Sequence, residues 1–276
     1  MIELPEAVSI SMDLNETIRG KRMIAAGTGE GAHKWVTYQP SREELTAWLV
    51  GKTVGEVSSK GRSIHIGMES GQALVIDEFG GKVLYSDPES EAPKKHHLLT
   101  VFDDESCLTI SIQGWGFLST LTEWKHSKWT RLRARALSPN GSDFTLENFF
   151  RAVETYPDKE KDSIKTFFTN GKSVAGIGNG YLQDILFQAE ISPKRKVSEI
   201  RSDEVPHLYA SVKQVIEQAI HACGRCCEKD IFGNPGGYVP LMDRKTQGQP
   251  CPRCGEPIQK ISYLGGSCYI CPTCQT

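Results

Sequence analysis

The sequence lacks any long run of apolar residues and any leader-like start. No segment of the 276 residues approaches the roughly 20 consecutive apolar side chains that a membrane-spanning helix needs. The first residues, MIELPEAVSI, carry two glutamates before any basic residue and lack the positive start and apolar run of a secretory signal. We therefore expect a cytoplasmic protein that does not bind a membrane.

An excess of basic residues is also missing. The chain has 32 Lys and Arg against 34 Asp and Glu, which gives a net charge of −2. Proteins that bind nucleic acid usually carry a surplus of positive charge that attracts phosphates. Because the acidic excess lies in the N-terminal half of the chain, any surface that binds nucleic acid must be local.

The chain is long enough for two cores, and its patterns change near residue 140. Apolar positions between residues 8 and 18 follow a helical period, and short alternating runs between residues 50 and 118 predict strands. Four helical segments follow, over residues 145–156, 162–171, 178–191 and 203–224. We therefore predict an α+β protein with a strand-rich N-terminal part and a helical C-terminal part.

Cysteines crowd the C-terminal end, where two C-x2-C pairs are separated by sixteen residues. Such pairs place four thiolates around one tetrahedral zinc ion. We predict one structural zinc bound by Cys251, Cys254, Cys271 and Cys274. Cys268 also forms a C-x2-C pair with Cys271, but choosing it would break the symmetry of two pairs, so we assign it as a neighbour of the metal.

A third C-x2-C pair, Cys223 and Cys226 in CGRC, stands at the end of a predicted helix. A redox pair would instead open a helix, where the helix dipole lowers the thiol pKa. We interpret these two thiols as packed or incidental.

A glycine-rich segment, GKSVAGIGNGYLQDILF, precedes one of the predicted helices. The glycines around Asn179 permit a tight turn, and backbone amides at a helix N-terminus can hold a phosphate. Most turns of this kind bind nothing, so the pattern alone does not establish a site.

At this point the sequence resembles the formamidopyrimidine-DNA glycosylase and endonuclease VIII (Fpg/Nei) family of base-excision DNA glycosylases. The start MIELPEA, the segment GIGNGYLQDILF and the pair CPRC and CPTCQ resemble the family's N-terminus, helix–two-turn–helix motif and zinc finger, in the family's order. The resemblance implies a β-sandwich flanked by helices over residues 1–138, a helix–two-turn–helix domain over 139–235 and a zinc finger over 236–276. It further implies a monomer that holds damaged duplex DNA with the target base flipped out.

The resemblance also implies residues that contact DNA. Asn179 matches the family residue that binds phosphate, with Gly178 and Lys172 beside it. In the stretch SKGRS, Arg62 falls where the family has a β-hairpin lysine, and Lys60 lies two residues earlier. Arginine can grip a phosphate but is a poor proton carrier.

The catalytic positions depart from the family. The family uses the amine of residue 2, exposed by removal of Met1, to form a Schiff base at sugar carbon C1′, with the following glutamate as acid and base. Here Ile2 is bulky enough to keep Met1 in place, whereas Glu3 and Glu6 are retained. We predict that the amine is displaced from Glu3 and that the usual Schiff base does not form efficiently.

Two further departures concern DNA contacts. The residues that the family inserts into the duplex align near Phe79 and near Trp115, which could equally be core aromatics. The family's zinc-finger arginine aligns with Gly266, so one phosphate contact is missing.

Three hypotheses about function remain open. The chain is an active glycosylase with altered chemistry, acting through Glu3 or the Met1 amine, or a DNA-binding protein that has lost the lyase activity. The third alternative, suggested by the acidic N-terminal half, is a zinc-stabilised module that binds protein.

Overall fold

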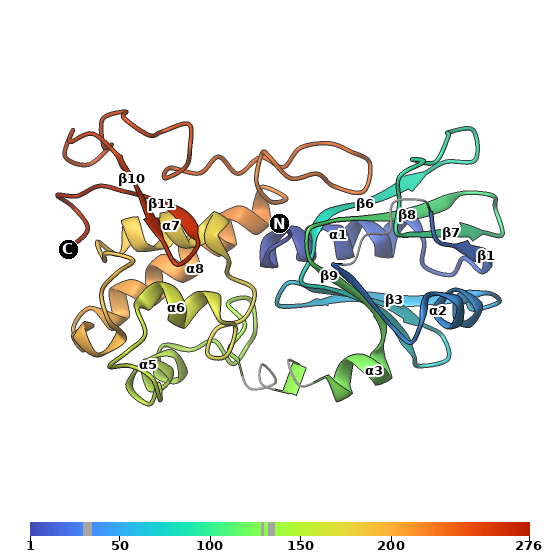
Figure 1. The fold of residues 1–276 in the computed structure, drawn as a ribbon, viewed down its shortest axis with the longest axis horizontal. Coiled ribbons are helices and arrows are strands. Elements are labelled where there is room, and N and C mark those ends of the chain that lie inside the picture. Colours follow the sequence, from blue (N-terminus) through green and yellow to red (C-terminus); the bar gives the residue numbers. More distant parts are fainter. Residues whose placement is uncertain (30–34, 128–129, 132–135) are drawn as a thin grey trace. The chain divides into compact units, whose positions relative to one another are not determined.

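A computed structural model describes residues 1–29, 35–127, 130–131 and 136–276 (Figure 1). The chain divides into two compact units, Met1–Arg131 with Ala222–Gly237, and Leu132–His221 with Tyr238–Thr276. Within the described ranges, no helix is both long and apolar enough to cross a membrane.

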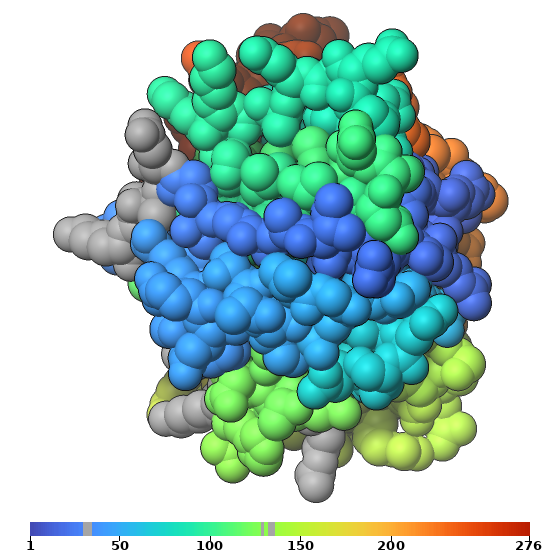
Figure 2. All heavy atoms as spheres, turned by 90° about the vertical axis from the view of Figure 1, so that its right-hand side faces the viewer, coloured from blue at the N-terminus to red at the C-terminus, as the bar shows by residue number. Residues whose placement is uncertain are grey.

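In the described part of the first unit, two sheets are accompanied by helices α1, α2 and α3. One sheet has the strand order β1-β7-β8-β6, and the other has the order β2-β9-β5-β4-β3, in which β2 and β9 are parallel. Figure 2 shows the face of this unit on which the dark-blue residues in the range of β1 lie between green residues in the range of β7 and β8 and lighter-blue residues in the range of α2. The elements are α1 (Leu4–Thr17), β1 (Met23–Gly27), β2 (Val36–Gln39), α2 (Arg42–Leu49), β3 (Val54–Lys60), β4 (Ser63–Met68), β5 (Ala73–Asp77), β6 (Gly80–Ser86), β7 (Leu98–Phe102), β8 (Cys107–Gln113), β9 (Gly116–Thr120) and α3 (Leu121–His126).

Both sheets and α1 contribute to one hydrophobic core. Helix α1 begins with a capping box between Glu3 and Glu6, and it packs its apolar side against β3 and β4. Ile10 and Leu14 of the helix are buried together with alternate residues of both sheets. The predicted β-sandwich flanked by helices is therefore confirmed.

The second unit is helical, with a two-stranded hairpin at its end. Thr145 and Ser163 cap α5 and α6 by accepting a backbone N–H in the first turn of each helix. Aromatic rings join these helices, among them Phe149 and Phe168, which stack 6.2 Å apart. The elements are α5 (Leu146–Glu154), α6 (Ile164–Thr169), α7 (Asn179–Gln188), η1 (Val197–Glu199), α8 (Val205–His221), β10 (Gln259–Tyr263) and β11 (Gly266–Ile270).

The four helices predicted after residue 140 all form, as do the first helix and the strands between residues 50 and 118. The sequence did not predict α2, α3, β1 or β2. These elements have between four and eight residues, too short for an apolar period to stand out.

The two compact units differ from the three predicted domains. Residues 222–237 belong to the first unit, because Ile231 is buried in its core and the Ile231 carbonyl accepts the backbone N–H of Tyr85 at 2.8 Å. The zinc-finger segment belongs to the second unit. There the buried Asp184 of α7 accepts the Tyr238 hydroxyl at 2.7 Å and the backbone N–H of Met242 at 2.8 Å.

Candidate functional site

The four predicted zinc ligands converge at the end of the second unit. The sulfurs of Cys251, Cys254, Cys271 and Cys274 all lie within 4.8 Å of one another. Two of the pairs, Cys251–Cys274 and Cys254–Cys271, are 3.9 and 3.4 Å apart. A tetrahedral zinc with bonds of about 2.3 Å requires sulfurs separated by roughly 3.8 Å, so the cluster fits that ion.

Backbone groups and apolar side chains support the cluster. The N–H of Arg253 donates to the Cys251 sulfur at 3.5 Å, and the N–H of Cys274 donates to the Cys271 sulfur at 3.4 Å. Phe187 of α7 packs with these cysteines in one small core. The cluster holds one structural zinc ion, as predicted, and fastens the β10–β11 hairpin to the helical unit.

Cys268 lies outside the quartet and has a different partner. Its buried sulfur accepts from the ammonium of Lys165 at 3.2 Å, and the same ammonium donates to the Tyr263 carbonyl at 3.0 Å. Lys165 on α6 thus ties the helical bundle to both strands of the hairpin. Sequence reasoning missed this contact, because the two residues are 103 positions apart.

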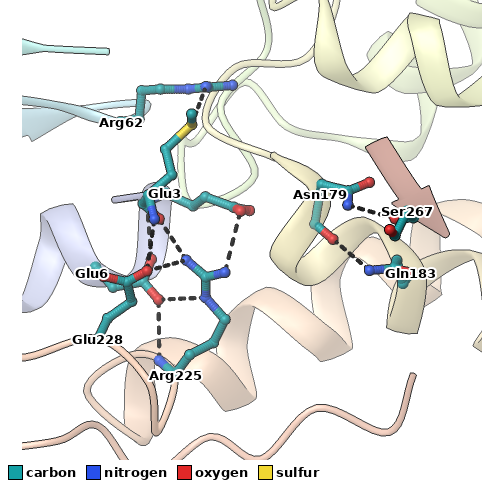
Figure 3. A network of polar contacts seen from close by, with 9 residues as sticks. Glu3, Glu6, Arg62, Asn179, Gln183, Arg225, Glu228 and Ser267 are labelled. Atoms are coloured by element: carbon teal, nitrogen blue, oxygen red, sulfur yellow. Dashed lines mark hydrogen bonds and ion pairs between the residues drawn. The ribbon is translucent and has the colours of Figure 1, made fainter. Parts of the chain in front are cut away.

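The glycine-rich turn ends at α7, and its asparagine reaches the same hairpin. Gly178 is the N-cap of α7, and Asn179 is the first residue of the helix. The exposed Asn179 side chain donates its amide to the Ser267 carbonyl at 2.9 Å (Figure 3). Gln183, one turn later, donates to the Asn179 carbonyl at 3.1 Å. The turn and the hairpin therefore form one polar surface.

Gly266 leaves room on this polar surface because it has no side chain. A Cβ atom at Gly266 would stand 3.6 Å from the Lys165 ammonium nitrogen and 4.0 Å from the Asn179 amide nitrogen. A side chain at this position would therefore lie beside two hydrogen-bond donors. The position where the resemblance implies an arginine is bare here, but its neighbours are polar.

A second polar cluster surrounds the N-terminus in the first unit (Figure 3). The Met1 ammonium donates to Glu228 at 2.7 Å. The guanidinium of Arg225 donates to Glu6 at 3.0 Å and to the Met1 carbonyl at 2.6 Å, and it lies 3.6 Å from Glu3. We call these five residues, Met1, Glu3, Glu6, Arg225 and Glu228, the N-terminal cluster.

Most of the N-terminal cluster is buried. The side chains of Glu3 and Glu6 are 2% and 3% exposed, and that of Arg225 is 9% exposed. Charges at this depth persist only when they are paired, because burial removes their hydration. Arg225 is therefore required by the two glutamates that the sequence singled out.

Ile2 belongs to the core. Its side chain is 1% exposed, and its backbone N–H donates to the Phe79 carbonyl at 3.0 Å. The nitrogen of residue 2 is thus an amide nitrogen engaged in a hydrogen bond. The displacement of the amine by one residue stays a prediction.

Three family models match the chain in order. The formamidopyrimidine-DNA glycosylase N-terminal domain matches residues 1–112, the formamidopyrimidine-DNA glycosylase H2TH domain matches residues 136–229, and the zinc finger found in FPG and IleRS matches residues 248–276. Together they cover most of the sequence, including the N-terminal cluster, the glycine-rich turn and the four cysteines.

The chain belongs to the Fpg/Nei family. It is 26% identical over 281 residues to the formamidopyrimidine-DNA glycosylase of Listeria innocua, with all of both chains covered. It is 25% identical to the enzyme of that name from Thermus thermophilus, over all of this chain and 98% of the relative.

Solved structures of the family share the fold. A complex between the Lactococcus lactis Fpg and DNA containing an abasic site matches with a TM-score of 0.85 at 23% identity, over 99% of each chain. The MutM (Fpg) protein of Thermus thermophilus matches with a TM-score of 0.82 at 24% identity, over 99% of this chain and 98% of that one.

The other residues predicted to contact DNA differ in their exposure and pairing. Lys60 is exposed at the end of β3, and Lys172 is exposed in the loop before α7. Arg62, in the turn after β3, is 12% exposed and pairs with Glu78 at 3.2 Å. The two lysines are open to solvent, whereas Arg62 is already held by a carboxylate.

The two aromatic residues that could insert into DNA differ in exposure. Phe79 is completely buried, so it is a core residue and does not insert into DNA. Trp115 is 62% exposed and lies 5.1 Å from the ring of Trp35, which is 46% exposed. Trp115 stays a candidate for insertion.

Arg225 and Glu228 are the site residues that sequence reasoning missed. They follow α8 and meet the first six residues of the chain, more than 200 positions away. Their only local sign is an Arg and a Glu three residues apart after a helix end, and this pattern usually belongs to a solvated surface.

Proposed function

We propose that this protein binds damaged duplex DNA and acts as a base-excision DNA glycosylase with altered amine chemistry. The observation that carries the proposal is the surface on which Asn179 at the start of α7 meets the zinc-bound hairpin through Ser267. A helix N-terminus and a side-chain amide are suited to a backbone phosphate. The complexes of the Lactococcus lactis Fpg with damaged DNA support the same use of this fold.

Burial of Ile2 supports altered chemistry. A buried side chain and a hydrogen-bonded amide nitrogen leave no amine at residue 2 while Met1 is present. Arg62, paired with Glu78, stands where the resemblance implies a lysine. Both differences lie in the first unit, whereas Asn179 and the zinc-bound hairpin, which we propose to contact phosphates, belong to the second unit.

A direct test compares two duplexes that differ only by a central tetrahydrofuran abasic-site analogue. We expect the protein to bind the damaged duplex more tightly, and both affinities to fall with rising salt, because phosphate contacts release counterions. Equal affinity for both duplexes, or no binding at low salt, would contradict the proposal.

Damage recognition without catalysis is a second candidate, favoured by the same burial of Ile2. Base release separates the two. A duplex containing a formamidopyrimidine lesion is incubated with the protein and then treated with alkali, which cleaves the strand wherever a base has been lost. Cleavage above background supports the glycosylase, and damage-selective binding without cleavage supports recognition alone.

A further inference from the structure

Lys165 and Cys268 form a buried amine–thiol pair in the second unit, outside the zinc cluster. The Lys165 ammonium nitrogen lies 3.2 Å from the Cys268 sulfur, and the two residues are 4% and 2% exposed. Lys165 belongs to α6 and Cys268 to β11, so the contact joins two elements that are far apart in the sequence. An amine and a thiol are both nucleophiles, and a bond between them therefore requires that one is first oxidised.

Hydrogen bonds and strand pairing hold both partners in place. The Lys165 ammonium also donates to the Tyr263 carbonyl at 3.0 Å, and Cys268 is paired with Ile261 in the β10–β11 hairpin. Groups held about 3 to 3.5 Å apart are at the distance from which bound partners react. The nitrogen and the sulfur are therefore already positioned for a reaction between them.

A small cavity lies beside the pair. It has a volume of about 10 Å³, and its lining includes Lys165, Cys268, Asn179, Gln183 and Tyr269. A cavity of this size holds about one molecule as small as water. Only a very small reagent can approach the buried sulfur by this route, and hydrogen peroxide is an oxidant of that kind.

Burial decides what an oxidised Cys268 meets. Cys223 and Cys227 are exposed, so a sulfenic acid on either would meet dissolved thiols and end as a mixed disulfide. Cys268 is buried, so dissolved thiols are kept away from its sulfur. The nucleophile in contact with that sulfur is the Lys165 nitrogen.

We propose that Lys165 and Cys268 are a site of oxidative modification, at which a peroxide converts the pair to a covalent sulfur–nitrogen bond. This inference goes beyond the proposed function and does not depend on it. The bond ties α6 to β11 and removes the positive charge of Lys165. A Cβ atom at Gly266 would stand 3.6 Å from the Lys165 nitrogen, so the modification alters the polar surface that contains Asn179.

The step balances in atoms and electrons. The Cys268 sulfur attacks one oxygen of hydrogen peroxide and the O–O bond breaks. The second oxygen leaves with the thiol proton as water, so the sulfur is oxidised to a sulfenic acid and the peroxide is reduced. The Lys165 ammonium releases one proton to solvent, and its nitrogen lone pair forms the S–N bond. The sulfenic hydroxyl leaves with a second proton from the nitrogen, as water.

Peptide mapping tests the step. The full-length, zinc-bound protein is treated with hydrogen peroxide, free thiols are blocked by alkylation, and the protein is digested with trypsin. We expect the peptide that contains Lys165 to be joined to the peptide that contains Cys268, with the mass of their sum less one molecule of hydrogen. Dithiothreitol added to the digest should separate the two peptides, because a thiolate attacks the bonded sulfur.

Three variants and one unfolded sample make the result specific. Cys268→Ser and Lys165→Arg should give no joined peptide, the latter because a guanidinium keeps its proton. Lys260→Arg, which changes an exposed lysine of β10, should give the yield of the parent. Oxidation of the parent in urea should lower the yield at least about ten-fold, because the two residues, 103 positions apart, then lose their fixed geometry.

The folded and unfolded parent proteins decide the test even where a variant fails to fold. No joined peptide from the folded parent, or an equal yield from the unfolded parent, would overturn the inference. A disulfide of Cys268 as the main product would overturn it as well. No DNA is present in this experiment, so its failure leaves the proposed function standing.

Discussion

The N-terminal cluster and the zinc-bound hairpin are assembled in opposite ways. The four cysteines of the hairpin lie within 24 residues of sequence and converge through two short repeats. The N-terminal cluster joins residues 1–6 to Arg225 and Glu228, across more than 200 residues. The first arrangement is stabilised by a metal ion, and the second by compensation among buried charges, so each should respond to a different perturbation.

The largest effect should come from removing a zinc ligand. Cys254→Ser leaves three thiolates, and structural zinc contributes on the order of 10 kcal/mol to small fingers. We expect loss of zinc and unfolding of the C-terminal segment, measured by metal analysis and by proteolysis near residue 250. The first unit should keep its resistance to protease.

Cys268→Ser is the matched control for the zinc prediction. Its sulfur contacts Lys165 and lies outside the quartet. The variant should keep one zinc per chain, and zinc loss in this variant would contradict the ligand assignment.

A smaller effect should follow from removing the cation of the N-terminal cluster. Arg225→Leu leaves Glu3 and Glu6 buried without their cation, and breaking one partner of a buried pair costs about 3 to 5 kcal/mol. We expect a lower free energy of unfolding in urea with unchanged zinc content. Lys213→Ala, which breaks an exposed pair with Glu217, should cost less than about 1 kcal/mol. Equal losses in the two variants would show that burial of the cluster does not matter.

Acid should weaken the first unit through His65. Burial, reinforced by Lys60 and Lys125, lowers the pKa of His65 to about 4. The unfolded chain takes up this proton near pH 6.5, so the free energy of unfolding should fall as the pH drops from about 6.5 to 4, by at most about 3 kcal/mol.

A His65→Gln variant checks this contribution of His65 to the pH dependence of stability. Its urea unfolding at pH 7 and pH 4.5 should show a weaker pH dependence than that of the parent, whereas the exposed His221→Gln should behave like the parent. Comparing variants removes the contribution of zinc release, which all three proteins share. An unchanged pH dependence in His65→Gln would refute the assignment.

The smallest effect should come from Asn179. A hydrogen bond to a charged group contributes about 1.5 kcal/mol, so Asn179→Ala should weaken binding about ten-fold. The loss should be equal for intact and abasic-analogue duplexes, because a phosphate contact carries no information about the base. Asn140→Ala, an exposed asparagine in a loop, serves as control. A loss of affinity confined to the damaged duplex would show that Asn179 contacts the lesion and not the phosphate backbone.

The parts that the sequence predicted are those encoded locally. Two C-x2-C pairs fix the ligands of a zinc ion, and three glycines around Asn179 mark a turn before a helix. The displaced amine that the bulk of Ile2 indicates stays a prediction. Nothing in the sequence near residue 1 could reveal that Arg225 and Glu228 contact Met1. These contacts form only because the segment after α8 packs in the first unit.

Phe79 and Trp115 show the same limit of prediction from sequence. Both are aromatic residues next to glycine in strand-rich sequence, and only the packing distinguishes a fully buried ring from one that is 62% exposed. The same holds for Arg62, whose pairing with Glu78 depends on how two neighbouring turns approach each other.

The central claim is that the N-terminal site of this chain is built around a retained Met1, with Ile2 in the core. The intact mass of the purified, untagged protein tests it most directly. Our account predicts a chain that begins with Met1 and has an unmodified amine. A mass lower by one methionine residue would place the free amine on Ile2 and contradict it.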